Sequence, residues 1–388
     1  MIKLKLTMTK LNDMLSLPKL IWLKYKRNTQ TMKERIYVCH TYYHAYVACL
    51  KELALPKERQ GHATLVLSMM SNNFGNLKER AGMCRLFEEV VMFDEKEDVF
   101  FPELQKYHKD RGNLVINMLA RIRYTKLLGK LQEPYVPVDF KQYKDVYVFC
   151  DSDPIGYYLS YRKIYYHALE DGLNCIQYYD TARYDNKGHF QFKAWMSSKN
   201  LIFIQNGYGK YCLDMEINDK SVVPYPCDKY IEQPRAALVD RLTDEDKELL
   251  LRLFLEDMDG LMDKLSHGEN NKILVLSEPL CELDVRKQIF TDIIEQYGTI
   301  DGRPGQILIK PHPRDVLDYE KEFSEHIVLS GSFPMEMLNF IPGLRFKRVI
   351  SVLTVPNGIR FADEILFLGE DFLDKYEEPS LHRQNEQI

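Results

Sequence analysis

One histidine in this sequence is held between two prolines. It is His312, in the run ILIKPHPRD of residues 307–315. The apolar start of the run predicts the end of a buried strand, and the prolines restrict the backbone on both sides of the histidine. An imidazolium fixed in this way could donate a hydrogen bond or a proton to a departing phosphate, with Lys310 and Arg314 adding positive potential. We therefore expect His312 to act on a phosphate leaving group.

Other polar residues follow the remaining predicted strands of the C-terminal half. Ligands of open parallel sheets bind outside the carboxyl ends of the strands. The residues at these positions are hydroxyls, carboxylates and a glycine, which suit a phosphate with a ribose behind it. They are Ser277, Glu278, Ser330, Gly331, Ser332, Ser351 and Thr354, with Glu336 at the start of a short predicted helix. This half is therefore expected to bind a nucleotide.

Carboxylates and hydrogen-bonding side chains follow the predicted strands of the N-terminal half. Those expected to bind an acceptor are Thr41, His44, Asn72, Asp151 and Asp153. Such groups suit a neutral ligand that is rich in hydroxyls. An attacking hydroxyl must lose its proton, and Asp171 or Glu170 is a plausible base. An acid on one domain and a base on the other fit an inverting displacement.

Alternating strand and helix patterns predict an α/β protein with two Rossmann-like domains and a cleft between them. The predicted strands are residues 35–41, 63–70, 88–93, 145–151, 164–172 and 201–209, then 272–279, 306–313, 326–331, 347–355 and 364–369. We expect a basic N-terminal segment (1–33), an acceptor domain (34–234), a helical connection (235–271), a nucleotide-sugar domain (272–370) and a tail (371–388). Residues 241–265 of the connection have a threonine cap at Thr243, acids in the first turn and an apolar stripe, which predict a helix.

Composition and charge narrow the class of protein. The 388 residues carry a formal net charge of −5, which gives no reason to expect a nucleic-acid partner. No long uncharged apolar run predicts a transmembrane helix. The eight cysteines include no CxxC pair, which favours free thiols in a reducing cytoplasm. Residues 1–33 hold eight Lys or Arg and one acid, a pattern compatible with peripheral contact at the cytoplasmic face of the inner membrane.

Two patterns raise the question of a metal. Asp151 and Asp153 directly follow an apolar strand, which is how metal-dependent transferases hold a cation on a nucleotide-sugar diphosphate. The C-terminal half has its own phosphate-binding loops, however, and these would be superfluous in such an enzyme. His40 and His44 lie four residues apart, but no further Cys, His or acid completes a site around them. We expect neither a metal nor another cofactor.

Several short motifs together resemble glycosyltransferase family 52, which includes bacterial lipooligosaccharide sialyltransferases and capsule enzymes. EDG at residues 170–172 is similar to the acid-acid-glycine motif of bacterial sialyltransferases, and HP at residues 312–313 to their histidine-proline motif. Ser351 with Thr354 resembles the later serine/threonine motif. The runs YVCHTYYH and DSDPIGYYL resemble this family in particular, and the resemblance covers roughly residues 35–369.

The resemblance implies a GT-B fold, CMP-sialic acid as donor, inversion at the anomeric carbon and no metal. It implies that His312 is the general acid or a phosphate ligand. The residues implied to line the CMP site are Lys310, Pro311, Pro313, Arg314, Met335, Glu336 and Ser351. Some members place the base in the loop after the first strand of the second domain. That loop reads SEPLCELD here, so Glu278 or Glu282 could substitute, and the base stays open between this loop and Asp171.

The expected function is transfer of sialic acid to a hydroxyl of a surface glycan, either lipooligosaccharide or capsular polysaccharide. Three alternatives remain: the same fold acting on another nucleotide sugar, the metal-dependent use of Asp151 and Asp153, and a non-catalytic glycan-binding protein. The partners expected are a nucleotide sugar and a glycan acceptor. The sequence leaves a homodimer open.

Overall fold

The computed structural model describes residues 32–149, 151, 153–172, 189–223, 227–266, 271–354 and 358–378. Most of the predicted basic segment and the end of the predicted tail lie outside these residues. Within the described part of the chain, no helix is both long enough and apolar enough to cross a membrane.

The first lobe is built on a seven-stranded parallel sheet with the order β3-β2-β1-β4-β5-β6-β7. Its strands are β1 (Lys33–Cys39), β2 (Ala63–Ser68), β3 (Glu89–Phe93), β4 (Tyr143–Phe149), β5 (Tyr166–Leu169), β6 (Cys212–Ile217) and β7 (Tyr230–Glu232). Its helices are α3 (Tyr42–Leu53), α4 (Leu77–Met83), α5 (Leu114–Leu131), α6 (Pro154–Arg162) and α8 (Phe190–Ser198). Every residue of β2 is buried, as expected for a strand covered on both faces.

The second lobe repeats this arrangement on a smaller scale. Its parallel sheet has the order β12-β11-β8-β13-β14, with strands β8 (Lys272–Leu276), β11 (Gln306–Lys310), β12 (Ile327–Val328), β13 (Phe346–Ser351) and β14 (Ala362–Phe367). Helices α12 (Leu283–Tyr297) and α13 (Tyr319–Glu322) belong to this lobe, and β9 (Thr299–Ile300) and β10 (Arg303–Pro304) form a small hairpin. The two lobes are the paired Rossmann-like domains of a GT-B fold.

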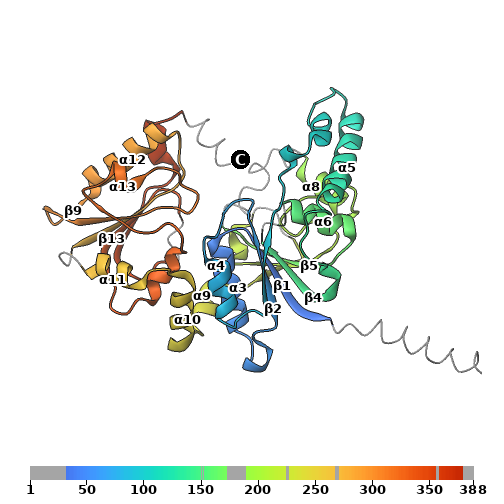
Figure 1. Ribbon diagram of the computed structural model, residues 1–388. Coiled ribbons are helices and arrows are strands. Elements are labelled where there is room, and N and C mark those ends of the chain that lie inside the picture. The colour runs from blue at the N-terminus through green and yellow to red at the C-terminus, as the bar shows by residue number, and fades with distance from the viewer. Residues whose placement is uncertain are drawn as a thin grey trace, which may run out of the picture.

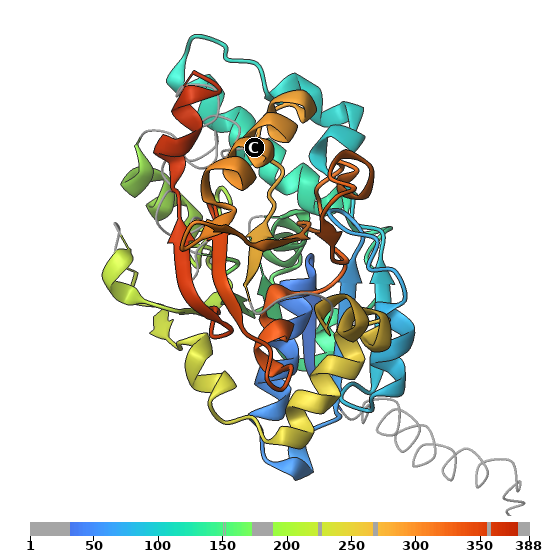
Figure 2. The ribbon, with the colours of Figure 1, turned by 90° about the vertical axis from the view of Figure 1, so that its left-hand side faces the viewer.

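Three helices connect the lobes, namely α9 (Arg235–Val239), α10 (Asp244–Phe254) and α11 (Met258–Ser266). They lie in the lower part of the molecule, with α9 and α10 beside the blue part of the first lobe and α11 beneath the orange second lobe (Figure 1). The view turned by 90° places the second lobe in front of the first (Figure 2). One hydrophobic cluster runs through the connection and includes Tyr46 of α3, Phe254 of α10 and Phe340 of the second lobe. This apolar contact fixes the lobes together at their base.

One predicted strand is wrong. Residues 201–209 form turns, and the strand beside β5 is β6 instead. Asn206 and Gly207 have φ values of 64° and 81°, in the left-handed region, so this segment cannot continue as a strand. Its apolar side chains Ile202, Phe203 and Ile204 are buried against helices, which explains why its composition is that of a strand.

Candidate active site

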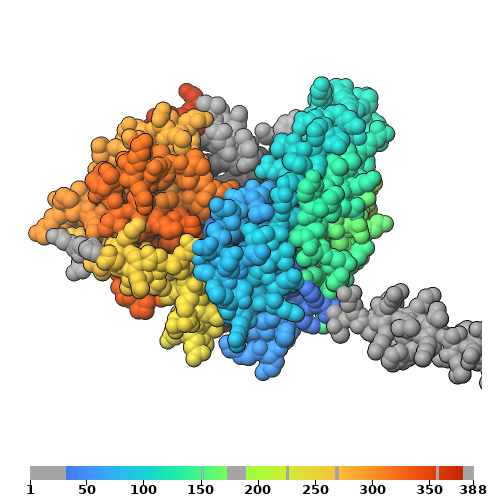
Figure 3. Space-filling view, in the orientation of Figure 1, coloured from blue at the N-terminus to red at the C-terminus, as the bar shows by residue number. Residues whose placement is uncertain are grey.

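The two sheets have equivalent switch points, where the order of the strands reverses. These points lie between β1 and β4 in the first lobe and between β8 and β13 in the second. Open α/β sheets bind ligands outside the carboxyl ends of the strands at such points. The loops after these four strands carry about half of the residues that the sequence nominates. His312 follows β11, the neighbour of β8, and Asp171 follows β5, the neighbour of β4. The space-filling view shows the lobes side by side, with a hollow between them above the connection (Figure 3).

Loops of the second lobe face the exit of β1 in the first. Tyr42 of the first lobe is hydrogen-bonded to Ser332 of the second. The Arg314 guanidinium lies close enough to His44 to contribute to the lowered pKa of that imidazole, which is due mainly to burial. The His312 loop is therefore directed toward the first lobe rather than into a core.

His312 is half-buried and has a defined tautomer. Its Nδ1 accepts a hydrogen bond from the backbone N–H of Arg314 at 3.1 Å, so the neutral ring carries its proton on Nε2. Burial, and then the charges of Arg314 and Lys310, lower the pKa of His312 to about 4. The sequence suggested an imidazolium, whereas the lowered pKa favours the neutral ring at pH 7. The neutral ring still offers an Nε2–H donor.

A buried network beneath His312 was missed by the sequence analysis. The backbone N–H of His312 donates to Ser277 Oγ at 3.1 Å, and that hydroxyl donates to Asp315 Oδ2 at 3.0 Å. Asp315 also accepts from the Tyr319 hydroxyl at 2.8 Å and pairs with Arg286 at 2.6 Å. These contacts fix the loop by polar groups from β8, α12 and α13. The aspartate in PHPRD was the only local signal of this network.

The ammonium group of Lys310 contacts the backbone of the second lobe rather than the cleft. Its ammonium group donates to the carbonyl oxygens of Pro311 and Gly331, at 3.1 and 3.2 Å, and lies 4.3 Å from the centre of the Phe333 ring. The side chain is buried, which lowers its pKa to about 7, with Glu336 acting in the opposite direction. Lys310 therefore ties the histidine loop to the next loop through backbone carbonyl groups.

Glu278 is held inside the second lobe and is unsuited to be the base. Its carboxylate accepts from the backbone N–H groups of Leu353, at 3.0 and 3.1 Å, and Thr354. Burial raises its pKa. Ser351 is also buried, and its hydroxyl donates to the carbonyl oxygen of Thr354 at 3.0 Å. Both side chains therefore shape the loop after β13 and do not face a ligand.

The other nominated residues of the second lobe are accessible to different degrees. Glu282 is exposed at the position before α12, where its side chain caps no backbone group. Those that are half-buried are Pro311, Met335, Glu336 and Thr354, and those that are exposed are Pro313 and Arg314. Burial raises the pKa of Glu336. These residues surround the exits of β11 and β13.

In the first lobe, Asp171 contacts a histidine from another strand exit. His44 Nε2 is hydrogen-bonded to Asp171 Oδ1. The Asp171 side chain is 36% exposed, whereas that of His44 is fully buried. The neighbouring Glu170 is buried and accepts from the backbone N–H and the side-chain amide of Asn218, at 2.6 and 3.0 Å. Asp171 is thus the accessible carboxylate of the EDG motif, and Glu170 is structural.

Asp151 is turned away from the cleft. Its carboxylate accepts from the backbone N–H groups of Asn206 and Gly207, at 2.6 and 3.1 Å, and from the Tyr166 hydroxyl at 3.1 Å. A Cβ at Gly156 would lie 1.6 Å from the Asp151 carbonyl oxygen, which explains the glycine of DSDPIG. The expectation that Asp151 binds the acceptor is therefore wrong in this structure. A metal bound by Asp151 and Asp153 would have to compete with these three hydrogen bonds for the Asp151 oxygens.

The remaining first-lobe residues position the exit of β1. Thr41 caps α3 by accepting from the backbone N–H of His44, and Asn72 donates to the carbonyl oxygen of His40 at 2.8 Å. Asp153 is buried, with its carboxylate 3.6 Å from His40 Nε2. Glu95, which the sequence did not reveal, lies 2.7 Å from the same nitrogen. Within the residues that the structure describes, no group of three or more His, Cys, Asp or Glu is arranged to hold a metal ion.

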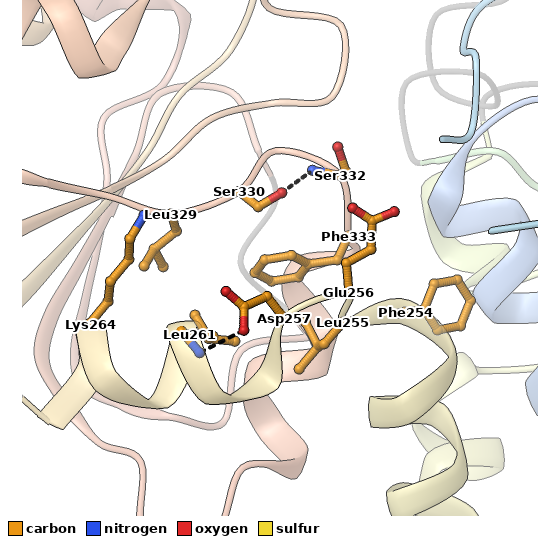
Figure 4. Close-up of a pocket in the computed structure, with 11 residues that line it drawn as sticks. Phe254, Leu255, Glu256, Asp257, Leu261, Lys264, Leu329, Ser330, Ser332 and Phe333 are labelled. Atoms are coloured by element: carbon orange, nitrogen blue, oxygen red, sulfur yellow. Dashed lines mark hydrogen bonds between the residues drawn. The ribbon is translucent and has the colours of Figure 1, made fainter. Parts of the chain in front are cut away.

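A separate cavity of about 150 Å³ lies at the connection. It is enclosed by α10, α11 and the loop of residues 329–333, with Lys264, Asp257 and Phe333 among its walls (Figure 4). Neither His312 nor Asp171 lines it. The strand exits, rather than this cavity, therefore define the candidate active site.

Similarity to known proteins agrees with this architecture. The chain is similar to the α/β-galactoside α-2,3-sialyltransferase of Photobacterium phosphoreum, at 11% identity and a TM-score of 0.50 over 87% of this chain and 91% of that one. It is also similar to the 2,6-sialyltransferase of Photobacterium sp. JT-ISH-224, solved with CMP and lactose, at 10% identity and a TM-score of 0.54 over 86% and 71%. At these identities the likeness establishes the fold alone.

Sequence comparison identifies the family. An uncharacterised protein of Haemophilus influenzae is 28% identical over 117 residues, which are 29% of this chain and 35% of that protein. The profile of glycosyltransferase family 52 matches residues 94–353, about two thirds of the chain, from the loop after β3 to the loop after β13. On this match, the chain belongs to glycosyltransferase family 52.

Proposed function

We propose that the chain is a sialyltransferase that moves sialic acid from CMP-sialic acid to a hydroxyl of a surface glycan, with inversion and without a metal. The observation that carries the proposal is the placement of His312 and Asp171 on opposite lobes, each at a strand exit that faces the other lobe. The Photobacterium enzyme solved with CMP and lactose has the same fold, which supports a nucleotide and a glycan as the ligands. Lipooligosaccharide and capsular polysaccharide are the acceptors that we consider.

The proposed reaction is a single displacement. The acceptor oxygen attacks the anomeric carbon, and its proton passes to Asp171. The bond from that carbon to the phosphate oxygen breaks, and its electron pair leaves with CMP. The Nε2–H of His312 donates to this phosphate, and the approach of the anion raises the pKa of the imidazole toward protonation. A donor that is already fixed in place stabilises the leaving group with little reorganisation.

Peripheral contact with a membrane is part of the proposal, since lipid-linked acceptors are held there. The N-terminal half of α5 exposes Leu114, Val115 and Leu119, with exposed fractions of 69%, 67% and 51%. Residues 106–130 carry seven Lys or Arg against one acid, in a chain of net charge −5. We call the exposed residues of this segment the α5 surface. A second copy of the chain would bring like charges together in a two-fold interface, whereas an anionic bilayer is complementary.

The test is release of CMP from CMP-sialic acid by the full chain, with lactose as a probe acceptor, in the presence and absence of EDTA. Release that EDTA does not change supports the proposal. Loss of release in EDTA would favour the metal-dependent alternative. If a panel of donors shows turnover of only a UDP- or GDP-sugar, the chain is a glycosyltransferase of the same fold that uses another donor. Binding of glycan without any turnover would favour a non-catalytic protein.

A further inference from the structure

We infer that His44 is a positioning residue for Asp171, holding the carboxylate that accepts the proton from the acceptor hydroxyl. The inference rests on the proposed function for its chemistry and on this structure for its geometry. The imidazole comes from the first turn of α3, and Asp171 follows β5. The sequence analysis treated His44 as an acceptor ligand, but its side chain is fully buried and cannot reach a bound glycan.

The tautomer of His44 is set by the backbone. Its Nδ1 accepts a hydrogen bond from the backbone N–H of His40 at 3.0 Å. A proton on Nδ1 would point at this N–H donor, so the proton must reside on Nε2. Nε2–H then donates to Asp171 Oδ1. Burial lowers the pKa of His44, which keeps the ring neutral at pH 7 and preserves one donor for the carboxylate.

The ring is held rigidly in this orientation. It stacks on Phe149, with the ring centres 4.3 Å apart and the planes 6° from parallel. Its own backbone N–H donates to Thr41 Oγ1 at 3.1 Å, which fixes the first turn of α3. A donor that is fixed by stacking and capping constrains the carboxylate that it contacts. Errors of about 1 Å in the placement of a reacting group cost roughly 100-fold in rate.

The contact also affects the charge of the carboxylate. A hydrogen bond to the ionised form of a carboxylate favours that form. With this bond, Asp171 would stay ionised, and able to accept a proton, down to a lower pH than without it. The charged or titratable groups around the pair include His40, Tyr43 and Asp153 from the first lobe, Glu170 next in the chain, and Arg314 from the second lobe. None of these groups contacts Nδ1 of His44 through its side chain in the described residues, so the backbone alone sets its tautomer.

Two variants separate positioning from simple packing. His44→Phe keeps a flat ring for stacking and removes both nitrogens. His44→Gln restores an amide N–H that can reach Asp171. We expect kcat of H44F to fall roughly 10- to 100-fold, and the acid limb of its pH profile to move to higher pH, while KM for CMP-sialic acid is unchanged. We expect H44Q to recover part of the rate and the position of the limb.

The double variant tests whether the two residues act as a unit. Once Asp171→Asn has removed the carboxylate, adding H44F should lower the rate little further. If H44F and H44Q, both folded by circular dichroism, lose equal activity with an unmoved pH profile, the inference fails. If H44F does not fold, His44→Asn replaces it, because an asparagine side chain cannot reach Asp171. The inference also fails if folded His44→Asn and H44Q both keep the wild-type activity and pH profile.

A measurement that needs no turnover distinguishes this inference from the proposed function. Nitrogen NMR of the imidazoles in the full chain should show His44 protonated on Nε2 and not on Nδ1 at pH 7. In Asp171→Asn the Nε2–H signal should shift, and the Nδ1 signal should not. A proton on Nδ1 would refute the geometry. Absence of any glycosyl transfer by the wild-type chain, with the expected NMR signals, would refute the proposed function alone.

Discussion

The Arg286 guanidinium and the Asp315 carboxylate form a buried ion pair, with Nη1 and Oδ1 2.6 Å apart, beneath the loop that carries His312. Arg286 also donates to the carbonyl oxygens of Leu280 and Cys281, at 2.6 and 2.8 Å. The pair thus joins the loop after β8 to the loop after β11. Because β8 borders the switch point of the second sheet and β11 is its neighbour, the pair sets the shape of the proposed nucleotide site.

Removing one partner of this pair should destabilise the protein. Asp315→Asn leaves the Arg286 charge buried without compensation, and such changes cost about 3–5 kcal/mol. We expect this loss in the free energy of unfolding in urea, together with a raised KM for the nucleotide sugar. The control is Glu322→Gln, which breaks the more exposed Lys287–Glu322 pair on the same lobe and should change the free energy of unfolding much less. Equal losses in the two variants would contradict a supporting role for Asp315.

His312 should be needed for turnover but not for the fold. His312→Ala removes the Nε2–H donor, and we expect kcat to fall roughly 10²- to 10⁴-fold. The residue is half-buried and its backbone contacts remain, so thermal unfolding should change little. His326→Ala, in the same lobe, is the matched control and should keep wild-type activity. Near-wild-type turnover by His312→Ala would remove this residue from the mechanism.

The base can be located by comparing two carboxylates. Asp171→Asn should lower kcat roughly 10²- to 10⁴-fold, because the amide cannot accept the proton. Glu282→Gln should leave kcat near that of the wild type, since this side chain is exposed at the start of α12. Initial rates of CMP release, measured side by side at saturating acceptor, decide between them. The opposite ranking would assign the base to the loop after β8.

The sequence predicted the features that depend on local order. Two parallel sheets follow from strand and helix alternation, and His312 and Asp171 were found because they follow apolar runs. Which way a side chain turns after its strand was not predictable. Asp151 and Glu170 occupy strand exits as expected, but each accepts hydrogen bonds from backbone groups of distant segments. Burial of a carboxylate depends on these partners, which no local pattern reveals.

Long-range partners account for the other misses. Arg286 and Asp315 are separated by 29 residues, and His40 and Glu95 by 55. Pairs of this kind form because α/β crossovers bring separate strand exits to one edge of a sheet. The wrong strand at residues 201–209 has a related cause. Apolar side chains that pack against helices produce the same composition as a strand. The Asn-Gly dipeptide at 206–207 is a turn signal that the apolar run before it obscured.

His40 should make the stability of the protein depend on alkaline pH. Burial lowers the pKa of His40, but Glu95 and Asp153 outweigh it and raise the pKa from 6.5 to about 9. Between pH 6.5 and about 9, His40 is therefore protonated in the folded state but not in the unfolded state. The resulting stabilisation, on the order of 3 kcal/mol, is complete below pH 6.5 and is lost as the pH rises through 9.

Comparison with a variant isolates this effect. Lys310 has a lowered pKa and acts in the opposite direction, since the unfolded state binds more protons above pH 7. The free energy of unfolding should therefore be measured for the wild type and for His40→Asn at pH 6 to 9.5, and the difference plotted. We expect the difference to shrink across this range. His62→Asn, at an exposed site, should give a flat difference. A flat difference for His40→Asn would mean that the buried pair is not charged.

The α5 surface should bind anionic membranes. Its apolar side chains can enter the headgroup region while Lys106, Lys109, Arg111, Arg123 and Lys130, all exposed, meet negative lipids. We expect the full chain to sediment with vesicles of phosphatidylglycerol more than with phosphatidylcholine, and 0.5 M salt to reduce this binding. Val115→Glu with Leu119→Glu should reduce it several-fold, whereas Met83→Glu, at an equally exposed apolar site on α4, should not. Deletion of residues 1–31 measures any contribution of the basic segment to vesicle binding. The α5 substitutions should not change the release of CMP from CMP-sialic acid when lactose is the acceptor. Unchanged sedimentation of the double variant, with the deletion abolishing it, would transfer the membrane contact to the N-terminal segment.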